Sequence, residues 1–393
     1  MPAMTASPAS TYDEDDAPPT GPGYLPRTLV LLGAGLAHLQ MLRQLAQKPL
    51  IGVQVVLVAP QAQQIVAACI PAWMAGRRAM EDCSIPLEPL VQRAGVRWLQ
   101  CGIRALDANG RLVLLDEGEP LAYDWLSINT APNANRELLE QAMPGVRTYG
   151  LFVRPIERFV ALWPQVAAKG DASPLRLAVV GAGAAGIELA LAARTRLPQS
   201  AITLVSGNTA PGASFNATTQ QRIAQVLRQR GITVLQGGAS GFADGVVQLG
   251  CGATLACDVP LIAVASHAPT WLQDSALALD ARGWVVVDDC LRSTSHPEVL
   301  AAGDVSARAD RSAPGGGTQA AHTADTLVRN LCALASNQPP TPHRPPAHTL
   351  SLLDCGDGKA LLDWGPWSLH GYAAGWLKRS LERKLVQRLT ATG

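Results

Sequence analysis

Two short glycine-rich segments contain the residue types best suited to binding a nucleotide. One reads Gly33-Ala34-Gly35-Leu36-Ala37-His38 and the other Gly181-Ala182-Gly183-Ala184-Ala185-Gly186, and each follows an apolar run. When such a segment joins a buried strand to a helix, its first glycine permits the tight turn. Its second glycine lets the backbone approach a diphosphate at the positive end of the helix. The sequence therefore predicts two dinucleotide sites, with binding residues Gly33, Gly35 and His38 in the first and Gly181, Gly183 and Gly186 in the second.

The residues around these turns leave part of the chemistry open. His38 stands where a third glycine normally allows helix and strand to pack closely, so we expect it to pack there or to contact the cofactor. The acidic residue that often binds the ribose about 20 residues further on is missing from both units. Ser206 ends the corresponding strand of the second unit, and no arginine follows it. We expect Ser206 in the second site, and the choice between NADH and NADPH stays open.

Elements able to hold such turns alternate along the chain. Apolar runs that end in glycine, as at Leu29–Leu32 and Leu175–Val180, are typical of parallel strands buried on both faces. Helical stretches separate several of them, which predicts an α/β fold with two Rossmann-like units. The further expected strands are Val53–Val58, Arg111–Leu115, Trp125–Ile128, Ala201–Val205, Thr233–Leu235, Pro260–Val264 and Trp284–Val287.

Composition indicates a folded protein of two or three domains. The 393 residues are 48% hydrophobic and 16% charged, and the net charge of +1 predicts no nucleic-acid partner. Apolar runs fall short of the roughly 18 residues of a membrane span, and the N-terminus lacks signal-peptide order, so we expect a cytoplasmic protein. The eight cysteines form no closely spaced pair, which predicts buried thiols and no metal site. Two distant cysteines could still meet in space.

A third landmark lies far downstream, where Ser295–Ala302 leads into Gly303-Asp304. This pattern resembles the second FAD fingerprint of flavoproteins with two dinucleotide-binding domains. The resemblance implies that Gly303 and Asp304 belong to the FAD site, with Asp304 on the ribityl chain. It also places the next helix, with Gln319 and His322, at the pyrimidine edge of the flavin, where a positive helix end favours negative charge.

Within this superfamily of glutathione-reductase-type folds, the chain resembles type-two NADH dehydrogenases and the NADH-dehydrogenase-like module found beside selenide, water dikinase. The likeness lies in the first glycine segment, Tyr123–Ser127, Leu291–Pro297 and Leu369–Lys378. It implies FAD and NAD(P)H as cofactors and a hydride passed from the nicotinamide to the flavin. It further implies a quinone-like acceptor near the flavin. The expected catalytic residues are Glu188, beside the nicotinamide, and Gln319 and His322.

Two segments near the expected flavin depart from the family pattern. The loop Ile65–Pro71 lacks the polar Tyr-Ser-Gly-Met-type residues of relatives, and Asn129-Thr130-Ala131 replaces an Ala-Thr-Gly-type strand end. Three alternatives therefore stay open: a flavoenzyme of specialised-metabolite biosynthesis, a sulfide- or thiol-oxidising flavoprotein, and a non-catalytic nucleotide-binding protein. The second would need two cysteines beside the flavin, such as Cys69, Cys290 or Cys355. The lack of a local cysteine pair argues against electron relay through a disulfide.

The expected domain boundaries follow from these landmarks. They are a disordered tail at 1–26, an FAD-binding domain in two parts at 27–153 and 269–338, an NAD(P)-binding domain at 154–268, and a Pro-rich linker with an amphipathic segment at 339–393. The helix expected at 373–389 places Ala373, Leu377, Leu381, Leu385 and Leu389 at four-residue spacing among basic residues. We expect it to pack on its own protein, to pair two subunits as a homodimer, or to bind peripherally to the inner face of the cytoplasmic membrane.

Overall fold

The computed structural model describes residues 26–132, 134–264, 267–309 and 317–390, with side chains from 323 onward in the last range. The tail expected at 1–26 lies outside these residues except for Pro26. Within them, no helix is long and apolar enough to cross a bilayer.

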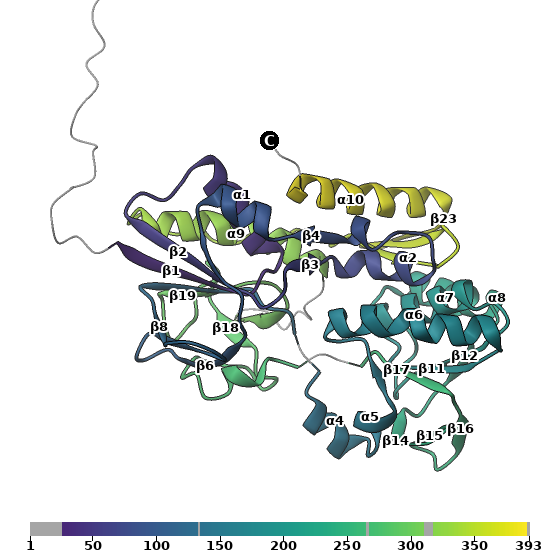
Figure 1. Cartoon of the computed structure of the whole chain (residues 1–393). Helices are drawn as coiled ribbons and strands as arrows, with labels where there is room; N and C mark the ends of the chain where they lie inside the picture. Colours follow the sequence, from purple (N-terminus) through teal and green to yellow (C-terminus); the bar gives the residue numbers. More distant parts are fainter. Residues whose placement is uncertain (1–25, 133, 265–266, 310–316, 391–393) are drawn as a thin grey trace, which may run out of the picture.

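Two units of the same design make up most of the molecule (Figure 1). The first has a five-stranded sheet in the order β19-β9-β1-β2-β5, and the second has the order β10-β17-β11-β12-β13. All neighbouring strands in both sheets are parallel. In each unit the strand that leads into a glycine turn, β1 or β11, is the central one. The fold class of two Rossmann-like units is therefore confirmed.

The strands of these sheets are mostly buried apolar runs, which suits strands covered on both faces. The first sheet consists of β1 (Arg27–Leu32), β2 (Val53–Val58), β5 (Arg97–Leu99), β9 (Trp125–Ile128) and β19 (Val299–Ala301). The second consists of β10 (Leu151–Phe152), β11 (Arg176–Val180), β12 (Ala201–Val205), β13 (Thr233–Leu235) and β17 (Val259–Ile262).

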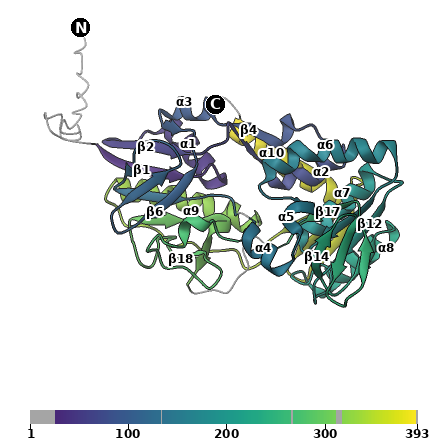
Figure 2. The ribbon, with the colours of Figure 1, turned by 60° about the horizontal axis from the view of Figure 1, so that its bottom comes forward.

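Helices cover the two sheets and separate them in the views of Figures 1 and 2. The first unit has α1 (Leu36–Gln47), α3 (Glu88–Ala94) and α9 (Gly317–Ala335), and the second has α6 (Ile156–Ala172), α7 (Ala184–Arg196) and α8 (Ala217–Gln229). Three further short helices are α2 (Ile70–Met74), α4 (Arg136–Ala142) and α5 (Val146–Tyr149). Helix α1 packs against α9 and α3, so the first glycine turn is held between helices and sheet.

Several smaller sheets surround these units, and two expected strands belong to them instead of the large sheets. The segment expected at Arg111–Leu115 forms β7 in an antiparallel sheet, and the one at Trp284–Val287 forms β18 beside β20. The small sheets consist of β3 (Gln63–Ile65) and β4 (Ser84–Pro86); β6 (Ile103–Asp107), β7 (Leu112–Leu115) and β8 (Leu121–Ala122); β14 (Ala239–Ala243), β15 (Val246–Leu249) and β16 (Thr254–Ala256); and β18 (Val285–Val287) and β20 (Ser306–Arg308).

The C-terminal part is larger than the helix expected from the sequence. It begins with an antiparallel sheet, β21 (Ser351–Asp354), β22 (Ala360–Trp364) and β23 (Trp367–Gly371), and ends in α10 (Tyr372–Thr390). In Figure 1, α10 lies above α2 and β4, across the junction of the two units, and contacts with β4 and β22 agree with that view.

Two chain segments tie the units together. Ile65, Ile70 and Met74, which follow β2 of the first unit in sequence, pack in the hydrophobic core of the second unit. Leu389, near the end of α10, packs in the core of the first unit. The junction between the units is therefore built from apolar contacts as well as from the polar cluster described below.

Candidate functional site

The first glycine turn lies at the carboxyl end of β1, beside β9. Gly33 has a φ of +87°, a conformation that favours glycine, and its N–H donates to the Val58 carbonyl at 2.8 Å. A Cβ on Gly33 would lie 2.8 Å from the Asn129 carbonyl oxygen, and one on Gly35 would lie 2.5 Å from the same atom. Helix α1 then begins at Leu36. The strand–turn–helix geometry expected from the sequence is present.

His38 is a fully buried residue of α1. Its Nδ1 lies 2.6 Å from the Gly33 carbonyl oxygen, and its Nε2 lies 2.8 Å from the Ser127 hydroxyl. Burial lowers the pKa of the imidazole to about 4, against the opposing effect of the Gly33 hydrogen bond, so the ring is neutral near pH 7. Because both ring nitrogens have protein partners, the structure places His38 in packing, the first of its two expected roles.

The Gly303-Asp304 motif lies at the same sheet edge as the first glycine turn. Strand β19, which leads into it, is the neighbour of β9, and β9 is the neighbour of β1. Gly303 has a φ of +79°, and the Asp304 side chain is one-third exposed, 3.9 Å from Arg154. The accessible carboxylate fits the ribityl-binding role implied for Asp304, and the tight turn at Gly33 fits the diphosphate-binding role implied for Gly33 and Gly35.

Asn129 joins these two motifs through its side chain, a role that the sequence analysis did not identify. Its Oδ1 accepts from the Ala37 N–H at 3.0 Å, and its Nδ2 donates to the Ala302 carbonyl at 2.7 Å. The residue thus links the start of α1 to the residue before Gly303. The departure from the Ala-Thr-Gly-type strand end marked this position as unusual without revealing its partners.

Gln319 and His322 lie in the first turns of α9, which packs against the short helix that contains Asp304. Their side chains lie outside the described residues.

The second glycine turn has the same topology and a more open surface. Gly181 has a φ of +114°, and its N–H donates to the Val205 carbonyl at 2.9 Å. A Cβ on Gly183 would meet no atom within 4 Å, whereas one on Gly186 would lie 1.8 Å from the Gly181 carbonyl oxygen. Gly186 thus lets α7 approach the turn closely, and Gly183 leaves room beside the start of α7. This geometry fits a diphosphate approaching Gly183.

Ser206 lies at the end of β12 and is fully buried. Its hydroxyl donates to the Leu235 carbonyl at 3.3 Å, and its N–H donates to the same oxygen at 2.8 Å. The serine side chain is therefore bonded to β13 within the sheet, and its hydroxyl is not presented to a ribose at the sheet edge.

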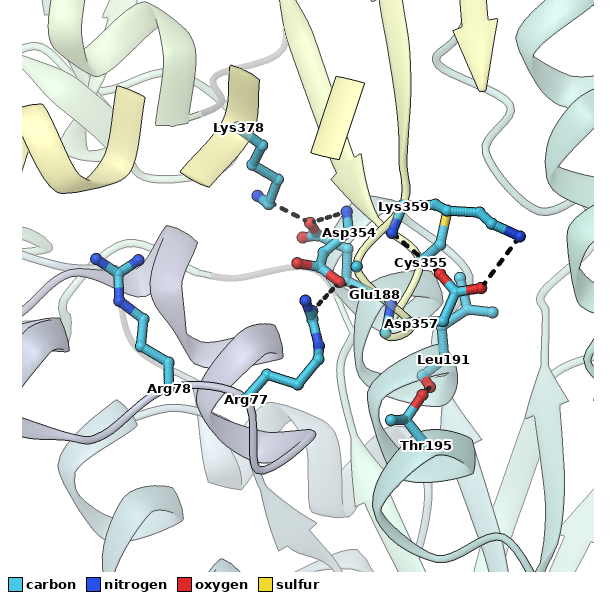
Figure 3. Close-up of polar contacts among 12 residues, drawn as sticks. Arg77, Arg78, Glu188, Leu191, Thr195, Asp354, Cys355, Asp357, Lys359 and Lys378 are labelled. Atoms are coloured by element: carbon cyan, nitrogen blue, oxygen red, sulfur yellow. Dashed lines mark hydrogen bonds and ion pairs between the residues drawn. The ribbon is translucent and has the colours of Figure 1, made fainter. Parts of the chain in front are cut away.

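Glu188 belongs to a buried cluster of charges at the junction of the units (Figure 3). Its Oε1 lies 3.2 Å from Lys378 Nζ and accepts from the Asp354 N–H at 2.7 Å. Lys378 also pairs with Glu382, Glu382 with Arg78, and Asp354 with Arg77, at 3.1, 2.8 and 2.5 Å. The cluster joins α7, β21, α10 and the loop after α2, and its three acidic and three basic side chains balance.

Burial and pairing shift the protonation of this cluster in opposite ways. Burial raises the pKa of the Glu188 carboxyl above its usual range, although Lys378 opposes the shift. Burial also works against the charge of Lys378, but Glu188 and Glu382 outweigh it and raise the pKa of the ammonium group. Glu188 is therefore a carboxyl able to exchange a proton closer to neutral pH than an exposed one.

The face of α10 that packs on the protein differs from the leucine stripe expected to be apolar. Its buried residues are Ala374, Gly375, Lys378, Glu382 and Leu389, while Leu381 of the expected stripe is 45% exposed. Lys378 and Glu382 can face the protein because Glu188 compensates the charge of the lysine and Arg78 that of the glutamate.

Comparisons with known proteins agree with this architecture. The family model described as pyridine nucleotide-disulphide oxidoreductase matches residues 27–326. An NADH dehydrogenase-like protein of Mycobacterium tuberculosis is 28% identical over 243 residues, which span 58% of this chain and 60% of that relative. An alternative NAD(P)H-ubiquinone oxidoreductase of Arabidopsis thaliana is 25% identical over 81% of this chain and 69% of its own length.

Solved structures show the same fold at lower identity. NDH2 of Plasmodium falciparum, solved with NADH, superposes with a TM-score of 0.76 at 14% identity over 93% of this chain and 97% of its own. The sulfide:quinone oxidoreductase of Aquifex aeolicus has a TM-score of 0.76 at 16% identity over 93% and 91%. FAD and NAD(P)H, the cofactors expected from the sequence, are those of the matched family. This chain belongs to the pyridine nucleotide-disulphide oxidoreductase family.

Proposed function

We propose that the protein is an FAD-dependent NAD(P)H dehydrogenase that passes electrons to a quinone-like acceptor. The observation that carries this proposal is the presence of two glycine turns of one topology, with Asp304 at the edge of the first. Relatives named as NADH dehydrogenase-like and NAD(P)H-ubiquinone oxidoreductase support it. When bound, FAD would accept a hydride from NAD(P)H and release electrons to the acceptor.

The residues of the chain would contribute binding, orientation and protons. Gly181, Gly183 and the start of α7 would hold the diphosphate of the nicotinamide nucleotide, while Gly33, Gly35 and Asp304 would hold FAD. Gln319 and His322 remain our proposal for the pyrimidine edge of the flavin.

Glu188 would supply a proton during reduction of the acceptor. Conversion of a quinone to a quinol consumes two protons as well as two electrons. Burial raises the pKa of the Glu188 carboxyl, and its Oε1 already accepts from Lys378 Nζ and from the Asp354 N–H, so a proton exchanged by Glu188 would be carried on Oε2.

Anaerobic titration tests the proposed reaction directly. NADH or NADPH added to the purified holoprotein should bleach the flavin absorbance, and a water-soluble quinone should restore it. A flavin that neither nucleotide bleaches would refute the proposed reaction.

The role of Glu188 is tested with Glu188→Gln and a matched control, Glu382→Gln, which touches the same lysine. Glu188→Gln should lower quinone turnover roughly a hundredfold, the usual contribution of a general acid, and leave turnover with ferricyanide near wild type, because ferricyanide takes no proton. Glu382→Gln should lower neither by that factor. Equal losses in both variants would indicate a structural role.

We also propose that the C-terminal part contacts a membrane surface peripherally. Exposed apolar side chains gather on β22, β23 and α10: Trp364, Trp367, Leu369, Tyr372, Trp376 and Leu381. Lys384 and Arg383 are exposed on the same helix. Aromatic side chains beside basic ones suit the interface between lipid headgroups and acyl chains, where a quinone-like acceptor dissolves.

Flotation with vesicles of phosphatidylglycerol and phosphatidylethanolamine tests this contact. The wild type should float, and a Trp367→Ser/Trp376→Ser variant should not. Leu138→Ser/Leu162→Ser, which removes exposed apolar side chains from α4 and α6, is the control and should float. Concentration-dependent dimerisation lost only in the tryptophan variant, without flotation of the wild type, would assign the surface to a homodimer instead.

A further inference from the structure

The hairpin formed by β3 and β4 brings two cysteines together. The Cys69 N–H donates to the Val66 carbonyl at 2.9 Å, and the Val66 N–H donates to the Cys83 carbonyl at 2.8 Å. The backbones of Cys69 and Cys83 are therefore both hydrogen-bonded to Val66. Cys83 Sγ donates to the Ala79 carbonyl oxygen at 3.3 Å and to the Cys69 carbonyl oxygen at 3.8 Å, so its thiol lies against the backbone of Cys69.

Two cysteines distant in sequence do lie together here, a possibility that the sequence left open. Cys69 was one of three cysteines considered for a thiol-oxidising protein, together with Cys290 and Cys355. Its partner is Cys83, 14 residues along the chain. No local spacing marks the pair, because the β3–β4 ladder, with Ile65 opposite Ser84, closes the loop between the two cysteines.

One basic side chain, Arg78, contacts the pair and is itself paired with Glu382. Arg78 Nη1 donates to Cys69 Sγ at 3.2 Å and to Glu382 Oε2 at 2.8 Å. The hydrogen bond from Cys69 lowers the pKa of Cys83, and Arg78 adds to that effect against the opposing effect of burial. The same contact raises the pKa of Cys69. One sulfur of the pair is thus favoured as the thiolate, which is the nucleophilic form of cysteine.

A cavity of about 560 Å³ approaches the pair from the side of α10. Its lining includes Ala72, Arg78, Asp82 and Ser84, which flank the two cysteines in sequence, and Arg379 and Arg383 of α10. Both thiols are themselves fully buried. A small uncharged oxidant can therefore reach the residues beside Cys69 and Cys83 while the protein stays folded. To reach the two sulfur atoms it needs a local opening of the structure.

We infer that Cys69 and Cys83 form a redox-active dithiol that hydrogen peroxide converts to a disulfide. The Cys83 thiolate would attack one peroxide oxygen, giving a sulfenic acid and hydroxide, which takes up the proton of the original thiol as water. The Cys69 thiol would then attack that sulfur, forming the disulfide and releasing a second water. Two thiols are oxidised and one peroxide is reduced to two waters. The inference does not depend on the proposed dehydrogenase function.

Thiol mapping of the full-length holoprotein tests the inference. All proteins would contain Cys251→Ser, because Cys251 is exposed and would consume oxidant. After hydrogen peroxide and then catalase, the denatured protein is alkylated with N-ethylmaleimide and digested. Cys69 and Cys83 should be lost from the alkylated peptides together, appear as one disulfide-linked peptide pair, and return fully after dithiothreitol.

Variants separate this pair from ordinary buried thiols. Cys83→Ser and Cys69→Ser should each abolish the linked peptides. The control Cys257→Ser removes a buried cysteine whose pKa burial raises to about 11, and it should leave the linkage unchanged. Should a serine variant fail to fold, the linked peptides of the parent protein still decide. Absence of a Cys69–Cys83 peptide, equal oxidation of Cys257, or loss of thiol that dithiothreitol does not reverse would overturn the inference.

Discussion

The two glycine turns have matching backbones and different surroundings. Gly33 and Gly181 donate to Val58 and Val205 at 2.8 and 2.9 Å. The residue after the neighbouring strand donates back to the central strand in both units, from Asn129 to Leu32 and from Ala263 to Val180, each at 2.9 Å. Asn129 and Ala263 are therefore equivalent positions, and so are His38 and Gly186.

These equivalent positions show that the same glycine spacing has different steric causes in the two units. In the first unit, the atoms of Asn129 occupy the space that a Cβ on Gly35 would need, and His38 bonds the turn from inside. In the second unit, Ala263 is small, Gly183 has free space, and Gly186 allows close helix packing. Contacts within the protein stabilise the first turn, whereas the second turn has open space beside Gly183.

The largest expected effect contrasts two alanine substitutions three residues apart. Gly186→Ala places a Cβ 1.8 Å from the Gly181 carbonyl oxygen, so we expect a loss of about 3 kcal/mol or more in unfolding free energy. Gly183→Ala meets nothing and should cost less than about 1 kcal/mol, while it raises KM for the nicotinamide nucleotide. Urea denaturation and steady-state kinetics measure both. Equal stability of the two variants would contradict the comparison.

An intermediate effect concerns pH and the buried imidazole of the first unit. Because folding lowers the pKa of His38 from 6.5 to about 4, the folded protein binds fewer protons than the unfolded chain between those values. Above pH 6.5 the imidazole is neutral in both states and does not affect stability. As pH falls toward 4, the unfolded chain takes up a proton that the folded protein does not, so the unfolding free energy decreases by about 3 kcal/mol in total. Denaturant titrations from pH 7 to 4 should show this slope, and His38→Gln should remove it. A variant with the wild-type slope would show that His38 is not its source.

The smallest effect tests whether Asn129 serves the cofactor site beyond general stability. Asn129→Ala, which copies Ala263 of the second unit, leaves Ala37 N–H and Ala302 carbonyl without their partner and should cost about 1–3 kcal/mol. Asn330→Ala is the control, because Asn330 also accepts from a backbone N–H, that of Thr341, and donates to backbone carbonyls, those of Cys290 and Thr341. Both should lower the melting temperature, and only Asn129→Ala should weaken FAD retention in a fluorescence titration. Equal flavin loss in both would reduce Asn129 to a structural residue.

The same contrast explains which features the sequence could predict. Strands such as β2, β9 and β12 were placed at their observed bounds because continuous apolar runs are typical of strands buried on both faces. Short half-exposed strands such as β21–β23 lack that signal and were not predicted. The glycine turns followed from local spacing, whereas the partners of Asn129 did not.

The charge cluster could not be read from spacing at all. Glu188 and the Asp354 N–H are 166 residues apart, and Cys69 and Cys83 meet only because a hairpin closes between them. Pairings of this kind depend on how distant segments dock, and no local pattern encodes that arrangement.

The arrangement of the charge cluster has a consequence for biosynthesis. Lys378 and Glu382 of α10 neutralise side chains that belong to much earlier parts of the chain, Glu188 and Arg78. A polypeptide that stops before Tyr372 would leave those earlier charges without their counterions and without the helix that packs on them. The junction of the two units is therefore completed only after α10 has been synthesised. A shortened chain would expose that junction to cellular proteases.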